Sequence, residues 1–168
     1  PHPGPDLPLM PSAVIRSTMP RPSAEVFALL HDYDRRLEWD TLLREARLTQ
    51  GHRQAGKGAT SLCVGKPLGG RIGIETRYLT FEPGSHAAVT MINRPPFFAT
   101  FSATIRHRDV PGGSTLDYKL HFTARPGWLR WLLHPLMLAA LKYETARRLG
   151  ALSAFLAKSG AAADDERS

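Results

Sequence analysis

Residues 20–30 have the sequence Pro-Arg-Pro-Ser-Ala-Glu-Val-Phe-Ala-Leu-Leu, and this stretch decides how the fold begins. Two prolines followed by a serine are typical of a helix start, because proline fits the first turn and serine suits the N-cap. Glu25 adds a negative charge in the first turn, where the helix dipole favours it. We therefore predict a short helix from Ser23 that buries Val26, Phe27, Leu29 and Leu30.

The segments on either side of this helix are predicted to be a strand and a second short helix. Residues 13–19 alternate and are flanked by prolines, which is typical of a strand. After a break at residues 32–34, a second helical piece is predicted over residues 35–42. Trp39 is interpreted as a core anchor beneath the short helices, with a stacking platform for a ligand as the alternative. Asp40 is expected to accept backbone hydrogen bonds nearby.

Between residues 43 and 125 the sequence has the pattern of a sheet. Strand-like runs alternate with clusters of Gly, Pro and Asn. Short connections between consecutive runs favour an antiparallel meander. The predicted strands are residues 43–50, 57–65, 71–82, 86–93, 98–109 and 114–125.

The last two of these strands are predicted to form a hairpin. Gly112-Gly113 suits a type I′ turn, because both central positions of that turn need a positive φ. The resulting register places His107 opposite Tyr118 on one face of the sheet. It also pairs Arg108 with Asp117, Ile105 with Leu120 and Ala103 with Phe122.

Beyond the last strand, apolar residues recur at spacings of three and four, which predicts an amphipathic helix. Pro135 is not expected inside an unbroken helix, so residues 128–134 are predicted to form a separate turn before a long helix that ends at Gly160. Glu144 and Arg148 have the spacing of an ion pair one helical turn apart. The predicted buried stripe is Leu138, Leu141, Thr145, Leu149, Leu152 and Leu156.

Together these elements predict an α+β fold. A curved, seven-stranded antiparallel sheet wraps around the long C-terminal helix, with two short helices between the first and second strands. A curved sheet diverges from a straight helix, and the middle of the buried stripe is Thr145, neighboured by the small residues Ala139, Ala140 and Ala146. We therefore expect a cavity between the sheet and the helix.

The length of 168 residues, without internal repeats, favours one domain. We assign that domain to residues 13–159. The proline-rich residues 1–12 are predicted to be a flexible leader, and residues 160–168 a flexible polar tail.

Composition excludes several classes of function. The net charge is +7, yet the arginines are scattered from Arg16 to Arg167 and no zinc-finger, P-loop or RNA-binding motif occurs, so nucleic acid is not an expected partner. The seven histidines lack metal-ligand spacing, and we expect neither a metal nor a cofactor. Cys63 is the only cysteine, which excludes an internal disulfide and favours a cytoplasmic protein. No apolar run is long enough to span a membrane.

The order of the elements resembles the START/polyketide-cyclase-like superfamily (SRPBCC, Bet v 1-like, helix-grip), in particular its bacterial polyketide cyclase/dehydrase and lipid transport branch. The resemblance covers residues 13–158 and is carried by residues 22–30, Trp39-Asp40, residues 81–83 and the terminal helix. It implies a ligand between sheet and helix. Members of this family bind apolar or aromatic small molecules, lipids and polyketides, and some cyclise or dehydrate them.

Inward-facing side chains are therefore the candidate site. With Leu79 and Phe81 taken as inward, Arg77 faces the cavity as well. The opposite phase would turn Ile74 and Tyr78 inward and leave Arg77 solvated. The candidate ligand-binding residues are Trp39, Arg77, Phe81, Met91, Phe101, His107, Tyr118, Phe122, Leu141, Thr145 and Leu149.

We expect the protein to bind an apolar or aromatic small molecule, such as a lipid or a polyketide-like compound. A polyketide aromatase/cyclase or dehydrase is one alternative, in which Arg77 stabilises an enolate and His107 or Tyr118 moves protons. A simple Tyr–His hydrogen bond at the cavity rim is the competing interpretation of that pair. Whether the protein is an enzyme therefore stays open.

A membrane-visiting lipid shuttle is the second alternative. Trp128 and Trp131 flank Arg130, and indoles mixed with a cation are typical of segments that contact an anionic membrane transiently. The competing interpretation is that both indoles form a lid over the cavity mouth. The sequence makes no prediction of oligomeric state.

Overall fold

The computed structural model describes residues 10–167 and has one sheet, three helices and two short 3₁₀ turns, η1 (Pro67–Gly70) and η2 (Gly127–Leu129). The helices are α1 (Ser23–Leu30), α2 (Arg36–Trp39) and α3 (Arg130–Asp165). The strands are β1 (Ser12–Met19), β2 (Leu43–Thr49), β3 (Thr60–Gly65), β4 (Gly73–Glu82), β5 (His86–Met91), β6 (Phe98–Val110) and β7 (Gly113–Ala124).

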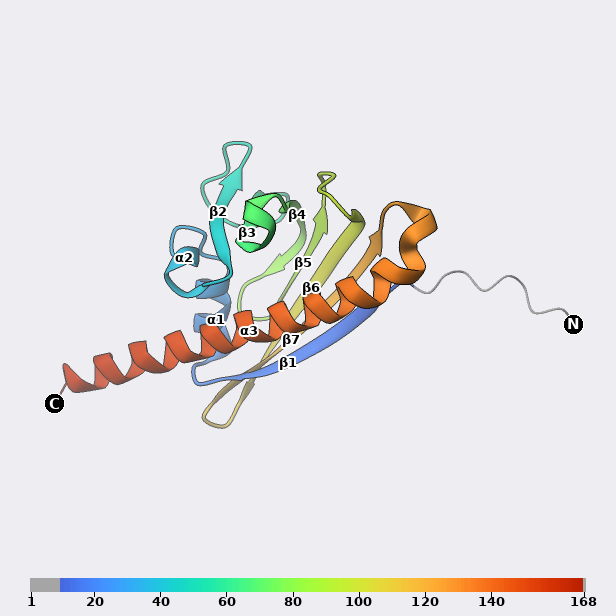
Figure 1. The fold of residues 1–168 in the computed structure, drawn as a ribbon. Helices are drawn as coiled ribbons and strands as arrows, with labels where there is room; N and C mark the ends of the chain where they lie inside the picture. The colour runs from blue at the N-terminus through green and yellow to red at the C-terminus, as the bar shows by residue number, and fades with distance from the viewer. Residues whose placement is uncertain (1–9, 168) are drawn as a thin grey trace, which may run out of the picture.

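The seven strands form one antiparallel sheet in the order β1-β7-β6-β5-β4-β3-β2. Strands β2 to β7 follow each other as a meander, and the last of them, β7, pairs with β1. The sheet is curved, α3 crosses it along its length, and α1 and α2 lie near the end formed by β2 (Figure 1). The predicted fold class is confirmed.

The main core lies where α1, the C-terminal half of α3 and the β1–β7 edge meet. Leu149, Leu152 and Leu156 recur on one side of α3 and are buried against Val26 and Leu30 of α1. Burying each such side chain contributes roughly 1.5–3 kcal/mol. This half of the helix is therefore held firmly against the strands.

The N-terminus of α1 is capped from a distant strand. Pro22 occupies the N-cap position and makes no side-chain cap, so Ser23 does not serve as the cap. Instead, the backbone N–H of Ser23 donates to Oδ1 of Asp109 at 2.7 Å. A carboxylate here also complements the positive end of the helix dipole.

The β6–β7 hairpin differs from the predicted one by two residues. Val110 pairs with Gly113, so the turn is Pro111-Gly112 rather than Gly112-Gly113. Proline favours the second position of a type II turn, and Gly112 supplies the positive φ (+82°) that the third position requires. The observed register pairs Arg108 with Thr115, Ile105 with Tyr118, Ala103 with Leu120 and His107 with Leu116.

The predicted start and end of the long helix are also wrong. Pro135 lies inside α3, which begins at Arg130. Two side chains fasten this start to β7, because Nε of Arg130 donates to the Ala124 carbonyl at 2.8 Å and Nε2 of His134 accepts from the Ala124 N–H at 3.1 Å. At the other end, α3 continues past Gly160 through a run of alanines, which are strong helix formers.

The predicted domain limits are only partly comparable with the structure. Residues 1–9 of the predicted leader lie outside the described residues. β1 begins at Ser12, and residues 160–165 of the predicted tail are helical. The division into leader, domain and tail stays a prediction.

The Pro111-Gly112 turn predicts that replacing Gly112 and replacing Gly113 by alanine lower the free energy of unfolding by different amounts. A Cβ at position 112 meets no atom, so Gly112→Ala should lose only the backbone cost of a positive φ, about 1–2 kcal/mol. A Cβ at position 113 meets the backbone carbonyl of Met19, so Gly113→Ala should cost more. Urea unfolding of both variants measures the difference. A smaller loss for Gly113→Ala would contradict the turn described here.

Candidate functional site

A cavity of about 380 Å³ lies between the sheet and the N-terminal half of α3. α3 runs straight where the strands curve away from it (Figure 1), and small residues such as Ala140 and Thr145 leave the gap unfilled. Most of the wall is apolar. Its hydrophobic part includes Ile72, Ile74, Phe98, Phe101, Ile105, Leu120, Met137 and Leu141.

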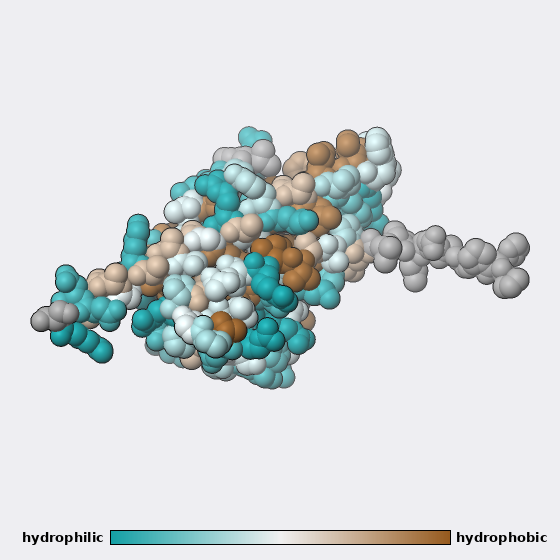
Figure 2. Space-filling model, turned by 90° about the horizontal axis from the view of Figure 1, so that it is seen from below, coloured by the Kyte–Doolittle hydropathy of each residue, from teal (hydrophilic) through white to brown (hydrophobic). Residues whose placement is uncertain are grey.

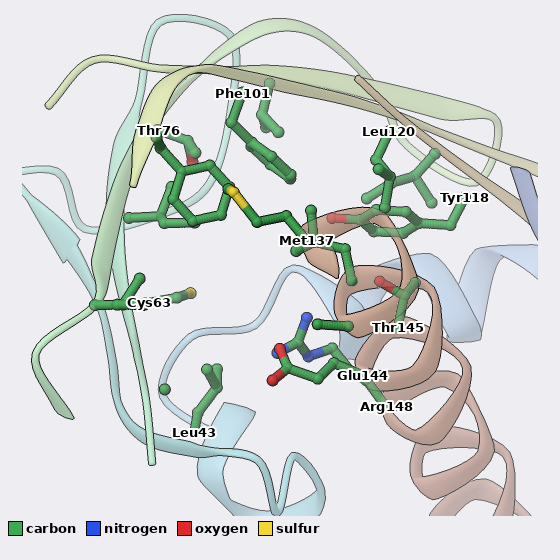
Figure 3. A pocket seen from close by; sticks show the side chains of 18 of the residues that line it. Leu43, Cys63, Thr76, Phe101, Tyr118, Leu120, Met137, Glu144, Thr145 and Arg148 are labelled. Carbon is green, nitrogen blue, oxygen red and sulfur yellow. The ribbon is translucent and has the colours of Figure 1, made fainter. Parts of the chain in front are cut away.

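Four of the eleven predicted ligand-binding residues line this cavity, namely Phe101, Tyr118, Leu141 and Thr145. Figure 3 shows Phe101 and Tyr118 on the sheet side and Thr145 on α3. Trp39, Phe122 and Leu149 are buried in the core instead, and Met91 packs beside Phe98 and Phe122. Phe81 and His107 pack around Phe27.

Arg77 is exposed and does not line the cavity, so the predicted phase of β4 is wrong at this residue. A β-bulge between Tyr78 and Thr80 breaks the alternation of the strand. Tyr78 and Phe81 consequently lie on the same side, with ring centroids 5.3 Å apart, while Leu79 is 50% exposed. Alternation counted backwards from Phe81 across the bulge therefore assigns Arg77 to the cavity side of β4, although its side chain lies on the other side.

His107 and Tyr118 are not brought together as a proton-transferring pair. His107 lies opposite Leu116, and its ring packs edge-on against Phe27 at 5.3 Å between centroids. Burial lowers the pKa of His107 to about 4, so the ring is neutral at physiological pH. Of the three predicted catalytic residues, only Tyr118 reaches the cavity.

A chain of hydrogen bonds on the cavity wall was not predicted from the sequence. Tyr33 donates to Oγ of Ser61 at 2.9 Å, and its hydroxyl lies 3.2 Å from that of Tyr78. Nδ1 of His31 lies 2.7 Å from the Tyr78 hydroxyl. Ser61 also bonds to Thr76 at 3.1 Å. His31 and Tyr33 follow α1 directly, and the other members lie on β3 and β4, so no local pattern joins them.

Burial keeps the members of this chain neutral. It lowers the pKa of His31 to about 3, and it raises the pKa of Tyr33 and, more strongly, that of Tyr78. Burial also raises the pKa of Tyr118 and of the Cys63 thiol, both of which line the cavity. The wall therefore offers uncharged hydrogen-bonding groups rather than phenolates, a thiolate or an imidazolium.

A buried ion triad lies at the same end of the cavity. Nε of Arg36 and Nε of Arg148 lie 3.0 and 2.8 Å from Oδ2 of Asp40, whose side chain is completely buried. Nη1 of Arg36 donates to the Leu30 carbonyl, and its guanidinium lies over the Trp39 ring at 4.7 Å. The triad connects α2 to α3 beside the cavity.

Arg148 thus pairs with Asp40, and among the ion pairs of residues 10–167 it forms none with Glu144. Glu144, half-buried on α3, also lines the cavity. Figure 3 shows both side chains extending from the helix into the cavity, across from Cys63. The spacing of four residues predicted Glu144 as the ion-pair partner of Arg148, but tertiary packing brings Asp40 to Arg148 instead.

The described part of the chain has neither a cluster of metal-ligating residues nor a helix that could span a membrane. Residues 10–167 contain no cluster of three or more His, Cys, Asp or Glu side chains that could hold a metal ion. Within the same residues, no helix combines the length and hydrophobicity that crossing a bilayer requires.

Comparisons with known proteins agree with this architecture. The family model described as "Polyketide cyclase / dehydrase and lipid transport" matches residues 10–156. No curated protein sequence matches the chain. The fold is similar to that of the Zhui aromatase/cyclase from Streptomyces sp. R1128, with a TM-score of 0.76 and 13% identity over 89% of this chain and 94% of that chain.

Two further solved structures show the same likeness. Ara h 8.0201 has a TM-score of 0.68 and 13% identity, covering 88% of this chain and 97% of that chain. The di-domain ARO/CYC StfQ from the steffimycin biosynthetic pathway has a TM-score of 0.75 and 12% identity, covering 91% of this chain and 53% of that chain. At these identities the likeness establishes the fold.

The triad makes a prediction about stability. Asp40→Asn leaves two buried guanidinium groups without their carboxylate, so the free energy of unfolding should fall by about 3–5 kcal/mol. Asp117→Asn is the matched control, because Asp117 pairs with Arg16 at the surface, where the side chains are 35% and 68% exposed. Urea unfolding should show a much smaller loss for the control. Equal losses would contradict the structural role of Asp40.

Proposed function

Because the chain belongs to the polyketide cyclase/dehydrase and lipid transport family, we propose that it binds an apolar or aromatic small molecule in the cavity between the sheet and α3. The observation that carries the proposal is the unfilled space of about 380 Å³, walled mainly by apolar side chains. Small-molecule sites have volumes of roughly 300–1,000 Å³ and few polar groups, and this cavity fits both criteria.

The proposed ligand contacts follow from the lining. Phe101 and Leu141 would contact the apolar body of the ligand from the sheet and from the helix. Tyr118 of β7 and Thr145 of α3 each add a hydroxyl group, and together these would orient a polar substituent. Orientation by a few hydrogen bonds within an apolar wall is the usual composition of such sites.

A cyclase or dehydrase activity receives less support from the geometry. Such chemistry needs a proton donor and a proton acceptor at the substrate. Arg77 is exposed and His107 packs against Phe27, so the predicted catalytic set does not meet at the cavity. Binding is therefore proposed as the primary function.

One observation favours a contact with membranes as well. Trp128 and Trp131 are 77% and 76% exposed, which supports a surface role rather than a lid. Leu132 and Leu136 are exposed next to them, and Figure 2 shows hydrophobic atoms gathered at the end of the molecule where α3 begins. This exposed group, Trp128, Trp131, Leu132 and Leu136, is called the indole patch below.

The charges around the indole patch suit an anionic bilayer. Between Asp117 and Glu144 the chain has no acidic residue, whereas it has basic residues such as Arg130 and Lys142. Phe97 lines the cavity, is exposed, and accepts a hydrogen bond through its carbonyl from the Arg125 N–H just before α3. A lipid-like ligand would then enter the cavity at the end that touches the membrane.

A large side chain in the cavity should weaken ligand binding. Both alanines are exposed on α3, but Ala140 lines the cavity and its neighbour Ala139 does not. Ala140→Trp should weaken binding of the uncharged fluorophore N-phenylnaphthylamine at least about tenfold, and Ala139→Trp should leave it unchanged. Fluorescence titration gives both affinities. Equal affinities of the two variants, or no binding by the parent protein, would contradict the proposed site.

The membrane contact is tested separately. The double variant Trp128→Ala, Trp131→Ala should lose most of its sedimentation with phosphatidylglycerol vesicles, because the indoles supply the interfacial anchors. Tyr143→Ala is the control, because Tyr143 is an exposed aromatic residue farther along α3. If the parent protein does not sediment with the vesicles, or if the double variant sediments equally well, the membrane contact is wrong.

A further inference from the structure

Glu144 and Arg148 place a hydrogen-bond acceptor and a hydrogen-bond donor side by side in the cavity. They lie one turn apart on α3, and both line the cavity. Figure 3 shows the carboxylate and the guanidinium at the same end, with the apolar side chains Met137 and Phe101 farther along. A ligand with its apolar body between the sheet and the helix would bring one of its ends to this pair.

The guanidinium is held in position rather than mobile. Nε of Arg148 forms the ion pair with Asp40 Oδ2 at 2.8 Å, and Nε of Arg36 lies 3.0 Å from the same oxygen. Asp40 Oδ1 additionally accepts the Leu42 N–H at 3.3 Å. With Asp40 fixed by these partners, Arg148 presents its remaining N–H groups from one defined place.

The formal charges at this end of the cavity balance. Arg36 and Arg148 carry two positive charges, and Asp40 and Glu144 carry two negative charges. The other titratable groups on the wall are neutral at physiological pH, because burial disfavours their charged forms. They are His31, Tyr33, Cys63, Tyr78 and Tyr118. A charged ligand group would therefore add an uncompensated charge to a largely buried site.

We propose that the ligand carries an uncharged hydroxyl group, as in an alcohol, a phenol or an enol, which donates to Glu144 and accepts from Arg148. This inference rests on the proposed function, because it names the class of molecule that the cavity binds. A hydroxyl group is both donor and acceptor, so it satisfies both partners at once. A ligand carboxylate would meet the Glu144 carboxylate, and a ligand ammonium would meet the Arg148 guanidinium.

The test compares three probes that share a tail and differ in the head. Para-heptylphenol has the uncharged hydroxyl, para-heptylbenzoate is an anion at neutral pH, and heptylbenzene has no polar head. Each competes with N-phenylnaphthylamine for the parent protein. The phenol should bind about tenfold more tightly than either of the others, because only the phenol pairs with both groups.

Glu144→Gln tests the role of the carboxylate without changing its shape. This variant makes the end of the cavity net positive, so the preference for the phenol over the benzoate should shrink at least about tenfold or reverse. Asp34→Asn removes the same charge from an exposed residue of the turn before α2, and it should leave the preference unchanged. Urea unfolding of each variant verifies that it is folded.

The outcomes separate the two proposals. If all three probes bind but with equal affinities, or if Glu144→Gln leaves the preference unchanged, the hydroxyl inference is wrong while the cavity remains a binding site. If neither the fluorophore nor any probe binds the parent protein, the proposed function is wrong and the inference is wrong with it.

Discussion

The structure depends on one straight helix that is fixed at two places against a curved sheet. In its C-terminal half, Leu149, Leu152 and Leu156 are buried against α1 and the edge strands. At the other end, Arg130 and His134 bond to the backbone of Ala124 at the end of β7. Between these two attachments the strands bend away from the helix, and small cavity-lining residues such as Ala140 and Thr145 leave the space unfilled. The cavity follows from that geometry.

The Arg36–Asp40–Arg148 triad adds a second constraint. Asp40 is completely buried, and its two arginine partners come from α2 and α3. A buried ion pair rarely stabilises a protein more than apolar residues of the same size would. The presence of the triad beside the cavity is better explained by its effect on Arg148, because the triad holds the guanidinium of Arg148 at the cavity wall. The same groups that connect the short helix to the long one therefore also determine the polarity of the site.

Much of the fold was predictable from the sequence because its signals are local. Alternation along the strands, the spacing of three and four in α3 and the prolines before α1 each report on a few neighbouring residues. The four predicted residues that line the cavity, Phe101, Tyr118, Leu141 and Thr145, lie on regular stretches of strand or helix where the period holds.

The remainder of the site could not be predicted because it depends on contacts between distant segments. The bulge after Tyr78 reverses the phase of β4, and the Pro111-Gly112 turn shifts the β6–β7 register by two residues. Arg148 finds its partner in α2 rather than one turn away on its own helix. Of these three features, only the turn had a signal in the sequence, because Pro-Gly is typical of a type II turn.

Native mass spectrometry of the freshly purified protein, repeated after incubation with an excess of an uncharged amphiphile, tests the central claim most directly. We expect one small molecule bound per chain, either retained from the cells or acquired during the incubation. A spectrum that shows only the mass of the bare 18.6 kDa chain in both cases would contradict it.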